Sequence, residues 1–192
     1  MNIAVYCASS NQLPAAYYEP ARQLGQYFAR AGHTLIYGDG GIGLMGALAD
    51  GVLGAGGEVV GVIPRFMVEQ GWNNPRSTRT IVTETMHERK HIIADMADAM
   101  FALPGGIGTF EELLECLTWK QLGLHTKPVV ILNLNGYYDH LLACLDRMVD
   151  EHFLRPVHRE RMFCVVDRPE QVLPAIADAP AWSQDIRREA AI

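Results

Sequence analysis

The chain has 192 residues, enough for one α/β domain with a sizeable core and little room for a second. Hydrophobic residues make up 49% of the chain and charged residues 20%, which excludes an intrinsically disordered protein. The net charge of −6 argues against a nucleic-acid partner, and no apolar run reaches the roughly 20 residues that a membrane helix requires.

Short apolar runs alternate along the chain with longer helical patterns. We predict strands at residues 2–7, 34–38, 58–64, 80–84, 99–104, 128–134 and 162–166, and helices at 17–31, 44–55, 86–97, 109–122, 137–150 and 169–177. Several strands are apolar on both faces, which is typical of a parallel sheet covered by helices on both sides. The fold class is therefore α/β, a doubly wound parallel sheet.

The predicted elements form a single domain over residues 1–180. Residues 67–78 are rich in Asn, Gly and Pro and are expected to form a surface loop. Residues 181–192 are expected to be a loosely held C-terminal tail. The four cysteines are scattered without a CxxC pair, and the N-terminus lacks the charged start of a signal peptide, so we expect reduced thiols and a cytoplasmic protein.

Four candidate ligand-binding stretches follow predicted strands, where doubly wound folds bind their ligands. They are Ser9-Ser10, "GDGGIGLMG" (38–46), the loop before Met86, and "PGGIGT" (104–109). "GDGGIG" matches the dinucleotide pattern GxGxxG, but it follows the second strand, and Glu58 begins the next strand instead of ending it. We interpret its glycines as a backbone surface for a smaller ligand; the alternative is a tight turn in which glycines permit close packing.

"HERKH" (87–91) is a formal HExxH, the zinc-peptidase pattern. The basic pair Arg89-Lys90 would oppose metal binding, and the alternating α/β pattern is wrong for that class of enzyme. We therefore expect no metal and assign the helix to its basic pair, with a solvated helix face as the alternative.

"PGGIGTFEE" (104–112) contains a capping box, with Thr109 as N-cap and Glu112 at the third helical position. A capping box explains neither the proline and three glycines before it nor the extra carboxylates of Glu111 and Glu115. Glycines before a helix are typical of a phosphate cradle.

The same stretch matches PGGxGTxxE, and the chain thereby resembles the LONELY GUY family of phosphoribohydrolases, long mislabelled as lysine decarboxylases. The likeness extends through "YGDGGIGLMG", "VIP", "MHERK", "TWKQLG" and "LNLNGYYD", over about residues 1–155. It implies a Rossmann-like fold and a homodimer or a multiple of it. The implied activity is hydrolysis of the N-glycosidic bond of nucleoside 5′-monophosphates, best known for N6-modified adenosine monophosphates, to free base and ribose 5-phosphate.

The resemblance also implies site residues, and no metal or organic cofactor. Arg89 and Glu112 would be the catalytic pair. The nucleotide site would be lined by Lys90, Gly105, Gly106, Ile107, Gly108, Thr109, Phe110, Glu111 and Thr118. Position on the fold adds Ser9, Ser10, Gly40, Gly41 and Gly43.

Cleavage of an N-glycosidic bond builds positive charge on the ribose, which a fixed carboxylate stabilises. The glycine amides and Thr109 would hold the 5′-phosphate, Glu112 would face the ribose, and Arg89 would separate the two negative charges. A decarboxylase using pyridoxal phosphate needs a Schiff-base lysine, and neither Lys90, Lys120 nor Lys127 stands in such a context. The alternative is a molybdenum-cofactor or nucleotide carrier of the same superfamily, although the Arg89 and Glu112 pair favours the enzyme.

Two positions depart from the family pattern. Asp39 stands where many relatives have a third consecutive glycine, and we expect its carboxylate near the ligand edge. Gly71 stands where many relatives carry a substrate-contacting Glu, while the neighbouring Trp72 offers an aromatic face. We therefore expect a broad base preference.

Overall fold

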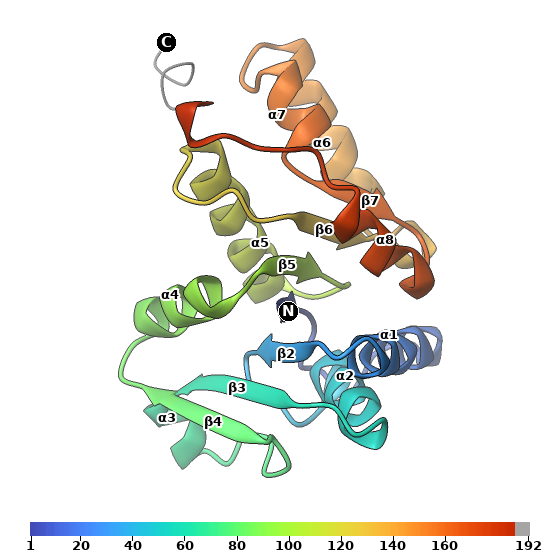
Figure 1. Ribbon diagram of the computed structural model, residues 1–192, viewed down its shortest axis with the longest axis vertical. Helices are drawn as coiled ribbons and strands as arrows, with labels where there is room; N and C mark the ends of the chain where they lie inside the picture. The colour runs from blue at the N-terminus through green and yellow to red at the C-terminus, as the bar shows by residue number, and fades with distance from the viewer. Residues whose placement is uncertain (187–192) are drawn as a thin grey trace.

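Seven strands form one parallel sheet in the computed structural model, which describes residues 1–186 (Figure 1). The spatial order is β4-β3-β2-β1-β5-β6-β7, and every neighbouring pair is parallel. The strands are β1 (Asn2–Tyr6), β2 (Thr34–Tyr37), β3 (Val59–Pro64), β4 (Arg79–Thr83), β5 (Ala99–Ala102), β6 (Val129–Leu132) and β7 (Cys164–Val166). All seven predicted strands are present, and the doubly wound Rossmann-like fold is confirmed.

Helices cover both faces of the sheet (Figure 1). One face packs against α1 (Tyr18–Arg30), α2 (Gly43–Gly54) and α8 (Val172–Ala177), and the other against α4 (Met86–Met96), α5 (Ile107–Gln121) and α6 (Asp139–Asp150). Successive side chains of a strand point to opposite faces, so the central strands must be apolar at every position. In β1, Ile3 joins the first core and Ala4 the second.

Several short helices escape the sequence pattern. These are α3 (Arg65–Glu69), α7 (Pro156–Arg161) and the 3₁₀ turns η1 (Ala15–Tyr17), η2 (Leu134–Gly136) and η4 (Gln184–Ile186), whereas η3 (Pro169–Gln171) lies within a predicted helix. Segments of three to six residues are too short to show a helical period. The predicted helix 169–177 is accordingly two pieces, η3 followed by α8.

Two expectations about irregular segments need correction. Residues 67–78 are not a continuous surface loop, because α3 reaches Glu69 and Asn74 is buried at 1% exposure. The start of the expected loose tail is packed: the Trp182 indole nitrogen donates to the Lys120 carbonyl at 2.8 Å. Residues 187–192, the rest of that tail, lie outside the described residues. Within residues 1–186 no helix is long and apolar enough to cross a membrane.

The order in which strands are added to the sheet changes direction between β1 and β5. Strands β2 to β4 lie on one side of β1, and β5 to β7 lie on the other. Such a reversal leaves a crevice outside the carboxyl ends of the strands, where open α/β sheets bind ligands.

Candidate active site

A cavity of about 740 Å³ opens beyond the carboxyl ends of β1, β2 and β3. Its size falls in the range of about 300–1,000 Å³ that is usual for small-molecule sites. Four segments predicted to bind ligand meet there: the residues after β1, the turn after β2, the start of α4 and the start of α5. The predicted site residues that line it are Ser9, Gly40, Gly41, Arg89, Gly106, Gly108, Thr109 and Glu112.

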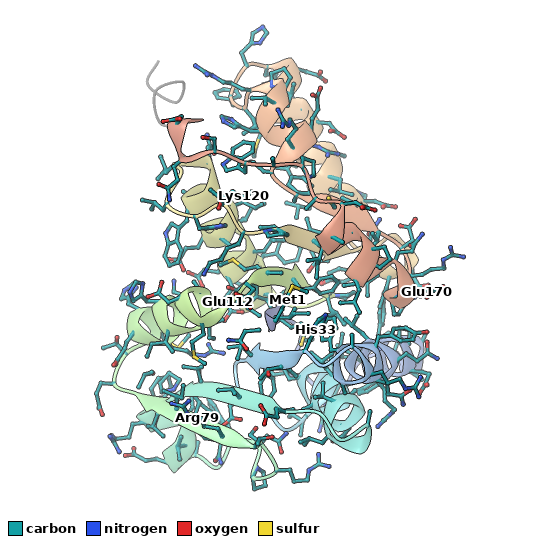
Figure 2. The ribbon with its side chains drawn as sticks, in the orientation of Figure 1. Met1, His33, Arg79, Glu112, Lys120 and Glu170 are labelled. Carbon is teal, nitrogen blue, oxygen red and sulfur yellow. The ribbon has the colours of Figure 1, made fainter. Side chains whose placement is uncertain are left out.

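Arg89 and Glu112 form a buried ion pair in the cavity wall. Arg89 Nη1 lies 3.4 Å from Glu112 Oε1, and each side chain is 7% exposed. Arg89 Nε also donates to the carbonyl of Val62 at 3.1 Å, which fixes the guanidinium at the end of β3. A Cβ atom at Gly38 would lie 1.9 Å from Arg89 Nη2, so the glycine after β2 leaves the space that this arginine needs. Figure 2 places Glu112 between α4 and α5, near the middle of the molecule.

Burial raises the pKa of Glu112 to about 7, against the opposing effect of the Arg89 charge. Taking a carboxylate out of water disfavours its charged form, and one nearby guanidinium only partly offsets that cost. Perturbed carboxyl groups in a cavity are typical of catalytic sites.

The N-terminus of α5 is open toward the cavity. The helix begins at Ile107, its N-cap is Gly106, and the first backbone bond within it runs from the Phe110 amide to the Gly106 carbonyl. The amides before Phe110 therefore have no partner within the helix and can bind an anion. Gly106, Gly108 and Thr109 line the cavity at this point.

The predicted capping box is wrong, because α5 starts two residues earlier than the sequence pattern indicates. Thr109 lies at the third helical position, is 4% exposed and makes no cap. It fills space beside Gly105, where a Cβ atom would lie 2.1 Å from Thr109 Oγ1. Glu112 is consequently not occupied in capping the helix.

At its C-terminal end, where α2 begins, the glycine turn after β2 allows close packing of the backbone. The amides of Leu44 and Met45, at the start of α2, both donate to the carbonyl of Ala8, at 2.9 and 3.1 Å. A Cβ atom at Gly43 would lie 2.6 Å from the carbonyl oxygen of Ser10. The α2 N-terminus is therefore already satisfied, which disfavours a dinucleotide site there, while Gly40 and Gly41 still line the cavity.

Lys90 ties α4 to α5 outside the cavity. Its Nζ lies 2.5 Å from Glu111 Oε1 and 3.0 Å from Glu115 Oε1. This contact accounts for the two carboxylates that the capping box left unexplained, and it holds α4 against α5 so that Arg89 faces Glu112.

The remaining predicted site residues do not line the cavity. Thr118 is exposed and donates its hydroxyl to the Leu114 carbonyl at 2.7 Å. Phe110 packs in a tilted arrangement on Tyr138, with ring centroids 5.5 Å apart, and Ile107 is 90% exposed. The others outside the lining are Ser10, Gly43, Gly105, Lys90 and Glu111.

Sequence reasoning missed the apolar wall of the cavity. It consists mainly of Met45, Ile63, Met67 and Met86. Apolar residues at such positions look like ordinary core in a sequence, and only their place beside the strand ends could have suggested a lining role. Trp72, 56% exposed, stands at the edge of this wall.

Two of the three residues that define the HExxH pattern, Glu88 and His91, have structural partners. The Glu88 carboxylate accepts from the Glu84 amide at 2.8 Å, and the Glu88 amide donates to Thr85 Oγ1, which caps α4. His91 pairs with Asp95 at 3.1 Å on the exposed face. In the part of the chain that the structure describes, no three His, Cys, Asp or Glu side chains gather in a group that could hold a metal ion.

Asp39 does not reach the ligand edge, contrary to expectation. It is fully buried, and its carboxylate accepts hydrogen bonds from Ser77 and Thr80 on the far side of the turn. Burial raises its pKa, while these hydroxyls oppose the rise.

Residues 45–176 match a family model described as "Possible lysine decarboxylase". Two curated proteins of Arabidopsis thaliana are similar over most of the chain. Cytokinin riboside 5′-monophosphate phosphoribohydrolase LOG2 is 41% identical over 168 residues, which cover 88% of this chain and 79% of the relative. Its paralogue LOG7 is 44% identical over 157 residues, or 82% of this chain and 72% of the relative.

Solved structures of lower identity share the fold. The molybdenum cofactor binding protein of Rippkaea orientalis superposes with a TM-score of 0.69 at 24% identity, covering 92% of this chain and 94% of that one. The molybdenum cofactor carrier protein of Chlamydomonas reinhardtii gives 0.68 at 22% identity, covering 92% and 96%. At such identities the likeness concerns the fold alone.

Proposed function

The chain belongs to the family of cytokinin riboside 5′-monophosphate phosphoribohydrolases, whose model carries the lysine decarboxylase description, and we propose that it hydrolyses nucleoside 5′-monophosphates to free base and ribose 5-phosphate. The substrate class is that of adenosine monophosphates, with or without an N6 substituent. The observation that carries this proposal is the buried pair of Arg89 and Glu112 beside the open N-terminus of α5.

The cavity offers separate places for the two ends of a ribose phosphate. The free amides at the start of α5 suit a phosphate, and the phosphate anchors the sugar before any bond breaks. Glu112 lies one turn further into α5, within reach of the ribose ring. As the bond to the base stretches, its carboxylate stabilises the positive charge that develops on the sugar or orients the attacking water.

Arg89 keeps phosphate and carboxylate compatible. Two negative charges in one cavity repel each other, and a guanidinium between them stabilises both. Arg89 is placed for this role by its bond to the Val62 carbonyl. We propose that the sugar or the base contacts the edge formed by Ser9, Gly40 and Gly41. The apolar wall would then face the base.

The positions of the lysines favour this hydrolase over a decarboxylase. Within residues 1–186 the lining of the cavity contains no lysine. Lys90 pairs with carboxylates of α5, and Lys127 donates to the Ala94 carbonyl at 2.6 Å. Lys120 is buried at 2% exposure and donates to the Lys127 carbonyl, far along α5 from Glu112 (Figure 2). A Schiff-base cofactor would find no amine in the cavity.

We further propose a homodimer or a multiple of it in the cytoplasm. Leu114, Leu122 and Leu124, on and after α5, are 41%, 48% and 57% exposed, and exposed apolar groups of this kind support self-association. The cysteines are free, as expected of a reducing compartment.

The test is incubation of the protein with a panel of nucleoside 5′-monophosphates, followed by detection of free base and ribose 5-phosphate. The matching nucleosides, which lack the phosphate, are the control. We expect base release from adenosine monophosphates and at least about a hundredfold less from nucleosides, because the anchor at α5 is lost. Absence of base release from every monophosphate would contradict the proposal.

A further inference from the structure

Asp39 combines three unfavourable features at one position. Its φ of 61° lies in the left-handed region, where a side chain is strained. The residue is 0% exposed, so a carboxylate has been taken out of water. The nearby strand β3 carries a glycine, Gly61, in its interior, because a Cβ atom at that position would lie 1.9 Å from Asp39 Oδ1. Backbone strain and the burial of a carboxylate cost free energy, and such costs persist where the surrounding structure depends on the contacts of that side chain.

The carboxylate ends a chain of hydrogen bonds from the segment of residues 72–78. Ser77 Oγ donates to Asp39 Oδ1 at 2.5 Å, and Thr80 Oγ1 donates to Oδ2 at 3.1 Å. Because the Ser77 proton is thus used, Tyr37 donates its hydroxyl to Ser77 Oγ at 3.1 Å, and Asn74 Nδ2 in turn donates to the Tyr37 oxygen at 3.0 Å. Hydrogen bonds aligned in this way strengthen one another.

The backbone joins the same two segments. The Asn74 amide donates to the Asp39 carbonyl at 2.7 Å, and Gly40 pairs with Asn73 in an isolated antiparallel bridge. Further anchors of the segment are an ion pair between Arg76 and Asp50 of α2, and Thr78 Oγ1, which accepts from the Val59 amide at 3.0 Å. Three other residues of the segment, Trp72, Asn73 and Pro75, line the cavity.

We propose that Asp39 is a positioning residue, which holds residues 72–78 against the turn after β2 and so fixes the cavity wall formed by Trp72, Asn73 and Pro75. This rests on the proposed function for the identity of the ligand, a nucleoside 5′-monophosphate. The wall belongs to the segment between α3 and β4, whereas Glu112 belongs to α5, so Asp39 acts on binding of the nucleotide and not on the bond-breaking step.

The chemistry of the network requires a carboxylate at this position. Ser77 and Thr80 both donate, and an ionised carboxylate accepts on both oxygens. An amide at position 39 would still accept on its oxygen but would present a donor to the second hydroxyl. Asn also tolerates a left-handed φ, so Asp39→Asn changes the hydrogen bonding without adding strain.

The experiment compares Asp39→Gly and Asp39→Asn with the wild-type protein. Glycine takes a φ of 61° without strain, so any loss in Asp39→Gly comes from the missing carboxylate. Ser183→Ala is the control, because Ser183 Oγ accepts from the Asp185 amide at 3.1 Å on an exposed segment outside both residues 72–78 and the cavity lining. Two quantities are measured: amide hydrogen exchange of residues 72–78 in the protein alone, and KM and kcat for adenosine monophosphate.

We expect amide exchange of residues 72–78 in Asp39→Gly to accelerate at least tenfold and KM to rise about tenfold, with kcat within about threefold of wild type. Asp39→Asn falls between Asp39→Gly and wild type, and Ser183→Ala keeps the wild-type KM. A tenfold rise in KM corresponds to about 1.4 kcal/mol of binding. The proposal is overturned if Asp39→Gly keeps wild-type exchange, if exchange accelerates while KM is unchanged, or if kcat falls while KM holds.

The positioning role and the enzymatic function fail separately. If the wild-type protein releases no base, the proposed function is wrong. The positioning role of Asp39 can still be tested in that case. Amide exchange is compared between wild type and Asp39→Gly, and the dissociation constant of adenosine monophosphate is measured for both by equilibrium dialysis. An unchanged dissociation constant in Asp39→Gly would overturn the positioning role on its own.

Discussion

Arg89 of α4 and Glu112 of α5 face each other in the cavity wall with 3.4 Å between Nη1 and Oε1. A charge-assisted hydrogen bond between such groups is usually about 2.7–2.9 Å long. The Arg89–Glu112 distance is longer, so the two groups form an ion pair without a short hydrogen bond. Each partner keeps the capacity to bind a ligand atom. A buried pair of this kind is a weak source of stability, because desolvation offsets most of the attraction. The two residues are therefore expected to matter for activity more than for folding.

Replacing Arg89 by lysine should lower kcat/KM for adenosine monophosphate by about a hundredfold or more. An ammonium group cannot reproduce the planar guanidinium that reaches both Val62 and Glu112 and that we propose also binds the phosphate. Arg65→Lys is the matched control, because Arg65 makes an exposed ion pair with Glu84 and should leave the rate unchanged. Steady-state kinetics of both variants provide the check, and full activity in Arg89→Lys would show that a diffuse positive charge is enough.

The raised pKa of Glu112, about 7 in the folded protein, predicts a pH-dependent difference in stability between wild type and Glu112→Gln. Between the unfolded value near 4.5 and pH 7 the folded state binds the extra proton, so wild-type stability falls as pH rises through this window. The variant lacks this group. Its free energy of unfolding should exceed that of wild type by up to about 3 kcal/mol above pH 7, and the gap should close toward pH 4.5.

Urea unfolding of both proteins at several pH values measures this difference. A variant less stable than wild type at pH 8 would mean that Glu112 stabilises the fold.

Activity should survive exhaustive chelation, and the purified protein should hold well under one zinc ion per chain. The Glu88 carboxylate accepts from the Glu84 amide and His91 pairs with Asp95, so these two residues of the HExxH pattern are engaged in structural contacts. His91→Ala should accordingly keep wild-type activity. Metal analysis before and after dialysis against a chelator, with rates measured on the same samples, decides the matter: loss of a stoichiometric metal together with activity would restore the zinc site.

The fold could be predicted from sequence because its signal is local and repeated. The five strands β1, β2, β3, β5 and β6 are apolar and buried on both faces along nearly their whole length, and longer helical patterns alternate with them. The start of α5 could not be predicted, because the local chemistry of Thr109 and Glu112 fits a capping box as well as it fits a buried site. Tertiary packing decided between them: Thr109 fits beside Gly105, and the helix begins at Ile107.

The candidate site was predictable only in part. Arg89 and Glu112 were assigned to the site by the resemblance to the family, whose motifs "MHERK" and "PGGIGTFEE" carry them. The resemblance also placed Lys90 in the site, yet adjacent helical residues point in different directions, and Lys90 reaches Glu111 and Glu115 instead. Asp39 was expected at the ligand edge. Its backbone has a left-handed φ and its carboxylate contacts Ser77, and no local sequence pattern predicts either feature.

Unmodified adenosine monophosphate should be turned over within about tenfold of an N6-modified one, a difference of at most roughly 1.4 kcal/mol. Gly71, in the cavity wall with a φ of 71°, offers no side chain to hydrogen-bond the substrate. The neighbouring Trp72 and the methionines present apolar surface, and stacking tolerates different bases. The measurement is kcat/KM for both nucleotides on one preparation. A preference for the modified base beyond a hundredfold would contradict the expectation and would require another residue to read the substituent.

The most direct test of the account is base release by Glu112→Gln, measured beside the dissociation constant of adenosine monophosphate for the same variant. Glutamine keeps the shape of the side chain and loses its charge, and α5 does not use Glu112 as a cap. The account predicts a loss of about 10²–10⁴ in the rate of base release, with a dissociation constant within about threefold of wild type. Turnover near the wild-type rate would contradict it, because the carboxylate opposite Arg89 would then have no part in breaking the bond.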